Sequence, residues 1–177
     1  FPGFQGEHAE DLYHACIAHI GAHIQFSGPK FPIRKLKPIQ IAVISLIEDA
    51  RVENLALREM PGLRRLWLPL HVAQTPSSLS PNHALMAPNL LARLARALID
   101  PDFSDFDGWV KKARSEFFLR EDSWEDPQFS RELGGLLGND LGQMRVGWQF
   151  DMSGYVVEPP YRDDNLGLWD FCEEQIP

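Results

Sequence analysis

The stretch 38–57 constrains the fold more than any other part of the sequence. Its first half, residues 39–47, is apolar on nearly every side of a helix, and a helix of that kind normally lies at the centre of a domain. Pro38 suits the first helical position, because a proline has a fixed φ and needs no amide hydrogen bond there. The second half carries acidic and basic side chains within the same apolar pattern. We therefore predict a central helix that brings charged groups into the interior.

A second helix is predicted at residues 7–26, where Gly28-Pro29 ends it. Its apolar stripe is predicted from large side chains at helical spacing, namely Leu12, Cys16, Ile17, Ile20 and Ile24. His19 and His23 border this stripe. The two segments together predict a mainly α fold, a multi-helix domain around a central antiparallel helix pair.

The two histidines on the first helix predict a metal site. His19 and His23 are four residues apart, so their imidazoles lie one turn apart on one helix face and can bind a single ion. Glu48 lies on the apolar stripe of the second helix, where a carboxylate needs a partner. We therefore predict one zinc ion bound by His19, His23 and Glu48. Asp49 and Glu53 are alternative ligands, or acceptors that orient the histidines.

Two other interpretations of these residues stay open. In the first, no metal is bound and Glu48 forms a core ion pair with Arg51, three residues further on. In the second, the chain is a degenerate zincin-like metallohydrolase. Zinc proteases carry a glutamate directly after the first histidine as the general base, whereas here that position is Ile20. A solvent-open ligand position with an acid in reach would favour the enzyme.

The remainder of the chain is predicted to add helices and then an irregular tail. The expected segments are 63–71 (a short helix or an extended piece), a helix from about Pro88 to 99, a helix over 105–119, and a helix over 127–146 weakened by four glycines. We expect one helical domain, 1–147. An aromatic and proline-rich extension, 148–177, is expected to pack on it, with a short hairpin near 148–157 as one form of that extension.

Charge and composition exclude several classes of protein. The first 99 residues carry ten basic and seven acidic side chains, and the other 78 carry seven basic and eighteen acidic ones. The acidic half argues against a nucleic-acid partner and suits docking of a basic protein.

No apolar run approaches a membrane span, and nothing resembles a signal peptide. Two cysteines far apart favour a reducing cytoplasm. The chain begins with Phe1, so we expect a fragment of a longer protein.

Three stretches of the chain resemble a known family. They are residues 47–53 with the histidine helix before them, Pro-Gly-Leu-Arg-Arg-Leu-Trp at 61–67, and Pro-Tyr-Arg-Asp-Asp-Asn at 160–165. Together they are similar to the N-terminal region of NorD-type nitric oxide reductase activation proteins and of the related CbbO proteins. The resemblance implies a longer protein with a von Willebrand factor A domain that works with a MoxR-type AAA+ ATPase. This chain would then be the adaptor or target-recognition module of a complex that activates a client metalloenzyme.

Overall fold

The computed structural model describes residues 9–71, 73, 86–144 and 159–172. The mainly α fold is confirmed. The described helices are α1 (Ala9–Phe26), α2 (Pro38–Glu59), α3 (Leu63–Trp67), α5 (Ala87–Ala97), α6 (Gly108–Leu119) and α7 (Gln128–Gln143). Single 3-10 turns follow at η1 (Leu68–Leu70), η3 (Glu121–Ser123) and η4 (Leu166–Leu168). The hairpin expected near 148–157 lies outside the described residues.

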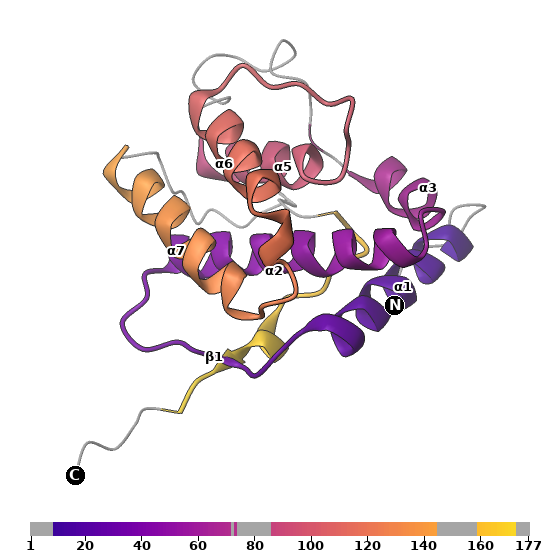
Figure 1. The fold of residues 1–177 in the computed structure, drawn as a ribbon, viewed down its shortest axis with the longest axis horizontal. Helices are drawn as coiled ribbons and strands as arrows, with labels where there is room; N and C mark the ends of the chain where they lie inside the picture. Colours follow the sequence, from indigo (N-terminus) through magenta and orange to yellow (C-terminus); the bar gives the residue numbers. More distant parts are fainter. Residues whose placement is uncertain (1–8, 72, 74–85, 145–158, 173–177) are drawn as a thin grey trace.

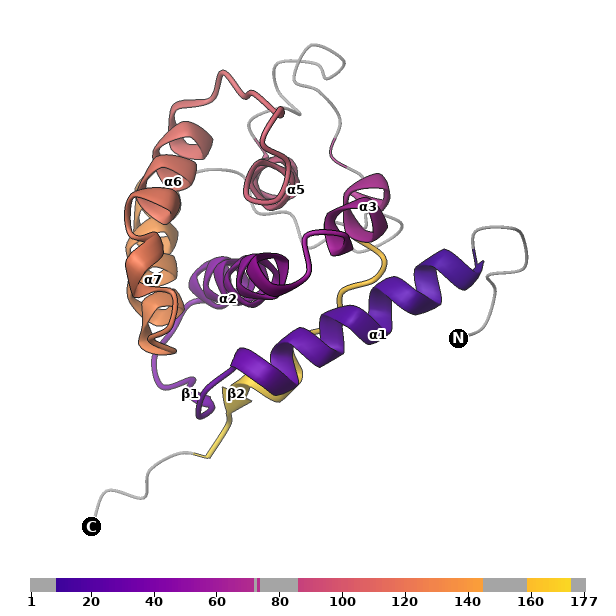
Figure 2. The same ribbon diagram turned by 45° about the vertical axis from the view of Figure 1, so that its right-hand side comes forward.

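Helix α2 lies at the centre of the domain, with α1, α5 and α7 around it (Figure 2). Pro38 occupies its first turn, and the Gln40 side chain accepts a hydrogen bond from the Lys37 amide at 2.8 Å. All residues from 43 to 57 are buried, the charged ones included. This burial confirms the central position that the apolar pattern predicts. Helix α1 runs in the opposite direction to α2 and crosses it obliquely (Figure 1).

Helix α7 packs more extensively on α2 than any other helix does. Two glycines make this close packing possible. A Cβ atom at Gly134 would lie 2.6 Å from the Cα of Ile44, and one at Gly138 would lie 2.9 Å from the Cα of Gln40. The sequence predicts that glycines weaken this helix, yet α7 runs unbroken from Gln128 to Gln143. The helix–helix contact that the missing side chains permit compensates for their low helix propensity.

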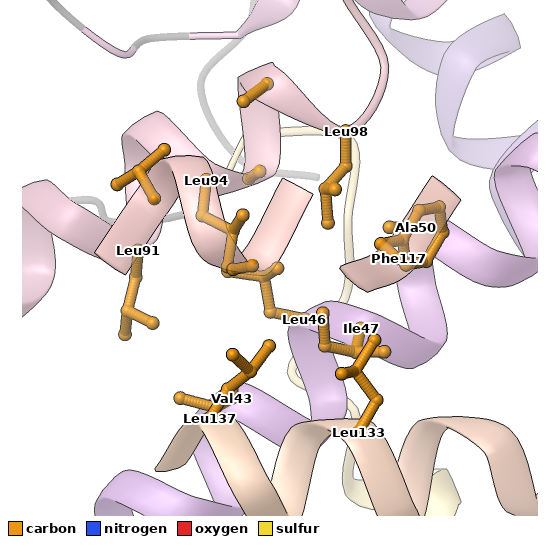
Figure 3. Packing of buried hydrophobic residues seen from close by; sticks show 14 of the residues in the cluster. Val43, Leu46, Ile47, Ala50, Leu91, Leu94, Leu98, Phe117, Leu133 and Leu137 are labelled. Carbon is orange, nitrogen blue, oxygen red and sulfur yellow. The ribbon is translucent and has the colours of Figure 1, made fainter. Parts of the chain in front are cut away.

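The main hydrophobic core lies between α2, α5, α6 and α7 (Figure 3). Its centre is formed by fully buried aliphatic and aromatic side chains, among them Val43, Ile47, Leu94, Leu98, Phe117, Leu133 and Leu137. Asp107 fixes the start of α6, because its carboxylate accepts hydrogen bonds from the amides of Trp109 and Val110. Pro88 lies in the first turn of α5, as the sequence predicts.

Helix α1 turns a different face to α2 from the one predicted. Its buried residues are Leu12 and Cys16 of the predicted stripe, together with Ala15, His19 and Ala22. Ile17, Ile20 and Ile24 are 50%, 47% and 81% exposed. The prediction is therefore right for Leu12 and Cys16 and wrong for the three isoleucines, because the buried face is centred roughly a quarter turn away from the predicted stripe. The histidine face of α1 is turned to α2 because His19 and His23 pair with Glu53 and Asp49. The small side chains of Ala15 and Ala22 lie buried on the same face.

Residues 159–172 return to the helices and pass along α1 and α2 (Figure 2). Strand β2 (Trp169–Asp170) pairs in parallel with β1 (Phe31–Pro32), with Phe31 opposite Trp169. Both aromatic side chains are buried, and the Trp169 indole donates a hydrogen bond to the Ser45 hydroxyl on α2 at 3.1 Å. This contact joins the end of the chain to the connector between α1 and α2.

Both cysteine thiols are free, with Cys16 buried and Cys172 exposed. Burial raises the pKa of the Cys16 thiol, so it behaves as a packed apolar side chain. Among the described residues, no helix is long and apolar enough to cross a membrane.

Candidate metal centre

Two histidines of α1 face two acids of α2, each pair being four residues apart. The Nε2 atom of His23 lies 3.1 Å from Oδ1 of Asp49, and the Nε2 atom of His19 lies 3.9 Å from the same oxygen. One ligand atom from each of His19, His23 and Asp49 lies within 4.8 Å of the other two. A tetrahedral zinc ion with bonds near 2 Å separates its ligand atoms by roughly 3.3 Å. The group of His19, His23 and Asp49 can therefore hold a metal ion with little movement.

His19 is completely buried, and in the described part of the chain one of its ring nitrogens has no hydrogen-bond partner. Its Nδ1 atom lies 3.0 Å from Oε1 of Glu53. A carboxylate only accepts hydrogen bonds, so Nδ1 carries the proton and donates it. The other ring nitrogen, Nε2, is buried 3.9 Å from Oδ1 of Asp49 and has no hydrogen-bond partner among the described residues. A buried ring nitrogen without a hydrogen-bond partner is costly, and a bound cation would satisfy it.

His23 is oriented through a serine. Its Nδ1 atom lies 2.9 Å from the Ser27 hydroxyl, which in turn donates to Oε1 of Glu48 at 2.9 Å. Because the only serine proton goes to Glu48, the serine oxygen accepts the proton of His23 Nδ1. Nε2 of His23 therefore faces the Asp49 carboxylate with either a second proton or a metal ion between them.

The pKa of His23 is set by burial and by the carboxylates around its ring. Burial alone would lower it, but the hydrogen bond and the charge of Asp49 raise it above its ordinary value, and the charges of Glu48 and Asp163 add to the effect. The raised pKa and the 3.1 Å separation of Nε2 from Oδ1 of Asp49 both favour a proton between the two atoms when no metal is bound. A metal ion that binds there must displace this proton.

Glu53 is held from the other end of the chain. Arg162 donates from Nε to Oε1 at 2.9 Å and from Nη2 to Oε2 at 2.6 Å, a bidentate pair. Burial would raise the pKa of Glu53, but the charge of Arg162 and the hydrogen bond from His19 hold it well below its usual range. Asn165 Nδ2 donates to Oδ2 of Asp49 at 3.1 Å. Glu53 is thus ionised, and hydrogen bonds fix the direction of both carboxylates.

Glu48, the carboxylate ligand in the sequence prediction, lies outside this group. Arg51 donates to both of its oxygens at 2.8 Å, and the hydroxyls of Ser27 and Ser130 donate one bond each. Four donors fill the acceptor positions of a carboxylate. Arg51 also donates to the Trp124 carbonyl at 2.6 Å. Glu48 and Arg51 therefore form the core ion pair of the metal-free interpretation, and Asp49 replaces Glu48 beside the histidines.

An aromatic layer closes the side of the centre next to α3. The ring of Tyr161 meets the ring of His19 edge-on, with centroids 5.7 Å apart, and stacks on Trp67. Its hydroxyl lies 3.0 Å from Nε2 of His71. Burial, with the charge of Arg162, lowers the pKa of His71 to about 3. His71 is therefore neutral at physiological pH and accepts the tyrosine proton.

Sequence reasoning finds the histidines and acids but misses Ser27, Arg162 and Asn165 as members of the centre. The sequence offers one indication of Arg162, which directly precedes Asp163 and Asp164. Arginine is the preferred partner of a buried carboxylate, so Arg162 could have been considered as a counter-ion for the acids of α2. The contacts themselves join residues more than a hundred positions apart.

No protein-family profile matches the chain, and no curated protein or solved structure matches it either. The resemblance to NorD-type proteins therefore rests on the three sequence stretches alone.

Proposed function

We propose that His19, His23 and Asp49 bind one zinc ion that fixes α1 on α2. The observation that carries this proposal is the buried Nε2 atom of His19, which has no hydrogen-bond partner among the described residues and belongs to a residue grouped with His23 and Asp49 within metal-binding distance. Two imidazole nitrogens and one carboxylate are a donor set that zinc accepts readily. Glu53, and Glu48 through Ser27, hold the opposite nitrogens of the rings, as acceptors behind metal-binding histidines commonly do.

The burial of the centre supports a structural ion over a catalytic one. The side chains of His19 and Asp49 are fully buried, and only His23, at 15% exposure, reaches the surface. Glu53 is bound to Arg162 through both oxygens, so it is not free to act as a general base. Ile20, the position of the general base in zinc proteases, points to solvent. A hydrolase needs an open ligand position and a free acid.

We further propose that the domain is a cytoplasmic adaptor, or target-recognition module, that acts with a MoxR-type AAA+ ATPase to activate a client metalloenzyme. The three stretches that resemble NorD-type proteins support this role, because all three contribute to one region of the fold. His19 and His23, Asp49 and Glu53, and Arg162 converge at the metal centre, and Trp67 lies behind Tyr161 next to it. The acidic second half would offer the docking surface.

The metal proposal is tested by the effect of zinc on thermal unfolding. Zinc in 100-fold excess over its dissociation constant adds about 2.7 kcal/mol of stability, so we expect the melting temperature of the chelator-treated protein to rise by about 5 °C or more. His19→Ala should abolish this rise. His14→Ala is the matched control, because His14 is an exposed histidine on the same helix. A chelator-treated protein that melts at the same temperature with and without zinc would refute a structural ion.

The adaptor proposal needs a separate experiment. Immobilised MoxR-type ATPase, loaded with ATP or ADP, is titrated with the zinc-loaded domain, and binding is followed by interferometry. We expect saturable binding that depends on the nucleotide and weakens with salt. Absence of binding in both nucleotide states would overturn the ATPase-partner role while leaving the metal centre intact.

A further inference from the structure

Helix α1 carries an apolar side that faces away from the domain. Tyr13, Ile17, Ile20 and Ile24 are 56%, 50%, 47% and 81% exposed, and we call these four residues the α1 stripe. α1 lies at the rim of the molecule, with α2, α3 and the C-terminal segment on its inner side (Figure 2). Four large apolar side chains in one row on a single helix mark an interaction surface.

The spacing of the α1 stripe is the same whether the helix is followed from its N-terminus or from its C-terminus. The steps are four, three and four residues, the spacing of apolar seams between paired helices. When two such helices lie antiparallel, Tyr13 of each copy faces Ile24 of the other, and Ile17 faces Ile20. A twofold interface requires this reciprocity, in which residue i contacts j and j contacts i.

The charges around the α1 stripe also favour an antiparallel second copy. Exposed Glu10 and Asp11 lie in the first turn of α1, and exposed Lys30 follows its last turn. An antiparallel pair places the acidic end of each helix beside the basic end of the other, whereas a parallel pair places like charges together. Gly21 borders the stripe with open space around its Cα, which allows the helices to approach closely.

We propose that the α1 stripe is the interface of a twofold symmetric dimer of this chain, in which the two α1 helices pack antiparallel. The whole chain has a formal charge of −8, so the net charges of two copies repel each other. The stripe itself carries no formal charge. A contact based on one helix from each copy is at the small end of protein interfaces, and the dimer therefore exchanges with monomer.

Sedimentation velocity over a concentration series tests the dimer. We expect the wild type to shift from monomer to dimer as concentration rises toward about 200 µM, which corresponds to a weak association free energy of roughly −5 kcal/mol. Ile17→Glu/Ile20→Glu should raise the dissociation constant by roughly tenfold or more, because it places four carboxylates in the apolar contact. Leu119→Glu is the matched control, since Leu119 is a 78% exposed leucine at the end of α6. A wild type that stays monomeric, or a dimer that the stripe variant does not weaken, overturns the proposal.

Charge exchange tests the antiparallel orientation and leaves the stripe intact. Glu10→Lys should weaken the dimer by about twofold to fivefold, and adding Lys30→Glu to it should restore the dissociation constant. Circular dichroism checks that each variant keeps the wild-type fold. A Glu10→Lys/Lys30→Glu protein that dimerises more weakly than Glu10→Lys alone would overturn the antiparallel arrangement.

Discussion

The candidate metal centre depends, at the scale of single residues, on the directions of a few hydrogen bonds. Glu53 takes the proton of His19 Nδ1, and Ser27 takes that of His23 Nδ1. Both Nε2 atoms are thereby turned toward Asp49. The carboxylate next along the chain, Glu48, has an entirely different role as the partner of Arg51.

Amide substitutions at Asp49 and Glu48 should separate the metal-binding role of the first from the ion-pair role of the second. We predict that Asp49→Asn lowers the zinc affinity by more than about 100-fold, because loss of an orienting group alone costs 10–100-fold. Glu48→Gln should leave one zinc per chain but destabilise the fold by roughly 3 kcal/mol, since it leaves Arg51 buried without its counter-ion. Zinc titration calorimetry and urea unfolding of the two variants check this. Equal zinc affinities would contradict the assignment of Asp49.

His71 should make the metal-free protein sensitive to acid. Its pKa is about 3 in the fold and near 6.5 when unfolded. The unfolded chain therefore binds more protons between these values, so the free energy of unfolding rises with pH across this window and the contribution is lost below it. We predict that His71→Gln, which can still accept the Tyr161 proton, removes up to about 1.4 kcal/mol per pH unit from that slope between pH 4 and 6.

Urea unfolding at several pH values, in the presence of a chelator, measures the slope for wild type and variant. His14→Gln serves as the control, because an exposed histidine on α1 should leave the slope unchanged. Parallel slopes for wild type and His71→Gln would contradict a neutral, buried His71.

The histidine pair and the acids could be identified from the sequence, because spacing by four residues places side chains on one helix face. The choice between Glu48 and Asp49 could not. These neighbours point about 100° apart on α2, and Ser130, far away on α7, completes the environment of Glu48. The pairing of Arg162 with Glu53 could not be predicted either, because the two residues are 109 positions apart and no local pattern connects them.

At the scale of helices, close approach decides which face is buried. The sequence correctly places α2 at the centre, because only a helix surrounded by other elements can be apolar on all sides. It misplaces the buried face of α1, because Ile17, Ile20 and Ile24 outweigh the small and polar residues in a hydrophobicity pattern. The inner face of α1 is defined by polar partners on α2, which a pattern of apolar residues does not reveal.

The glycines of α7 offer a matched pair of substitutions. We predict that Gly134→Ala destabilises the protein by about 1–3 kcal/mol, because its methyl group would collide with the backbone of Ile44. Gly142→Ala, with open space at its Cα, should stabilise by about 0.5–1 kcal/mol through helix propensity. Thermal and urea unfolding give both values. Stabilisation by both substitutions would show that α7 and α2 are not in close contact.

At the scale of the whole molecule, the C-terminal segment closes the structure around the centre. Arg162 and Asn165 bind the two acids of α2, Tyr161 covers His19, and Trp169 reaches Ser45 beside β1. The segment thereby connects α1, α2 and the connector between them. Assembly of the centre and docking of this segment are expected to be coupled.

Removal of the Arg162 guanidinium should disturb both the metal centre and the docking of the C-terminal segment. We predict that Arg162→Ala destabilises the fold by about 3–5 kcal/mol, because Glu53 is left buried without its counter-ion. Zinc affinity should fall by about 10–100-fold, since His19 loses its fixed acceptor. Arg120→Ala removes an exposed ion pair with Glu116 and should cost less than about 1 kcal/mol. Similar losses for the two variants would contradict a closing role for Arg162.

Elemental analysis of untagged protein, purified without chelator, tests the metal centre most directly. Wild type and His14→Ala should each contain about one zinc per chain, and His19→Ala/His23→Ala should contain none. This result would establish that α1 and α2 share an ion. Wild-type protein that holds no zinc, and takes up none on incubation and desalting, would contradict the metal centre and leave a protonated His23 between Asp49 and Ser27.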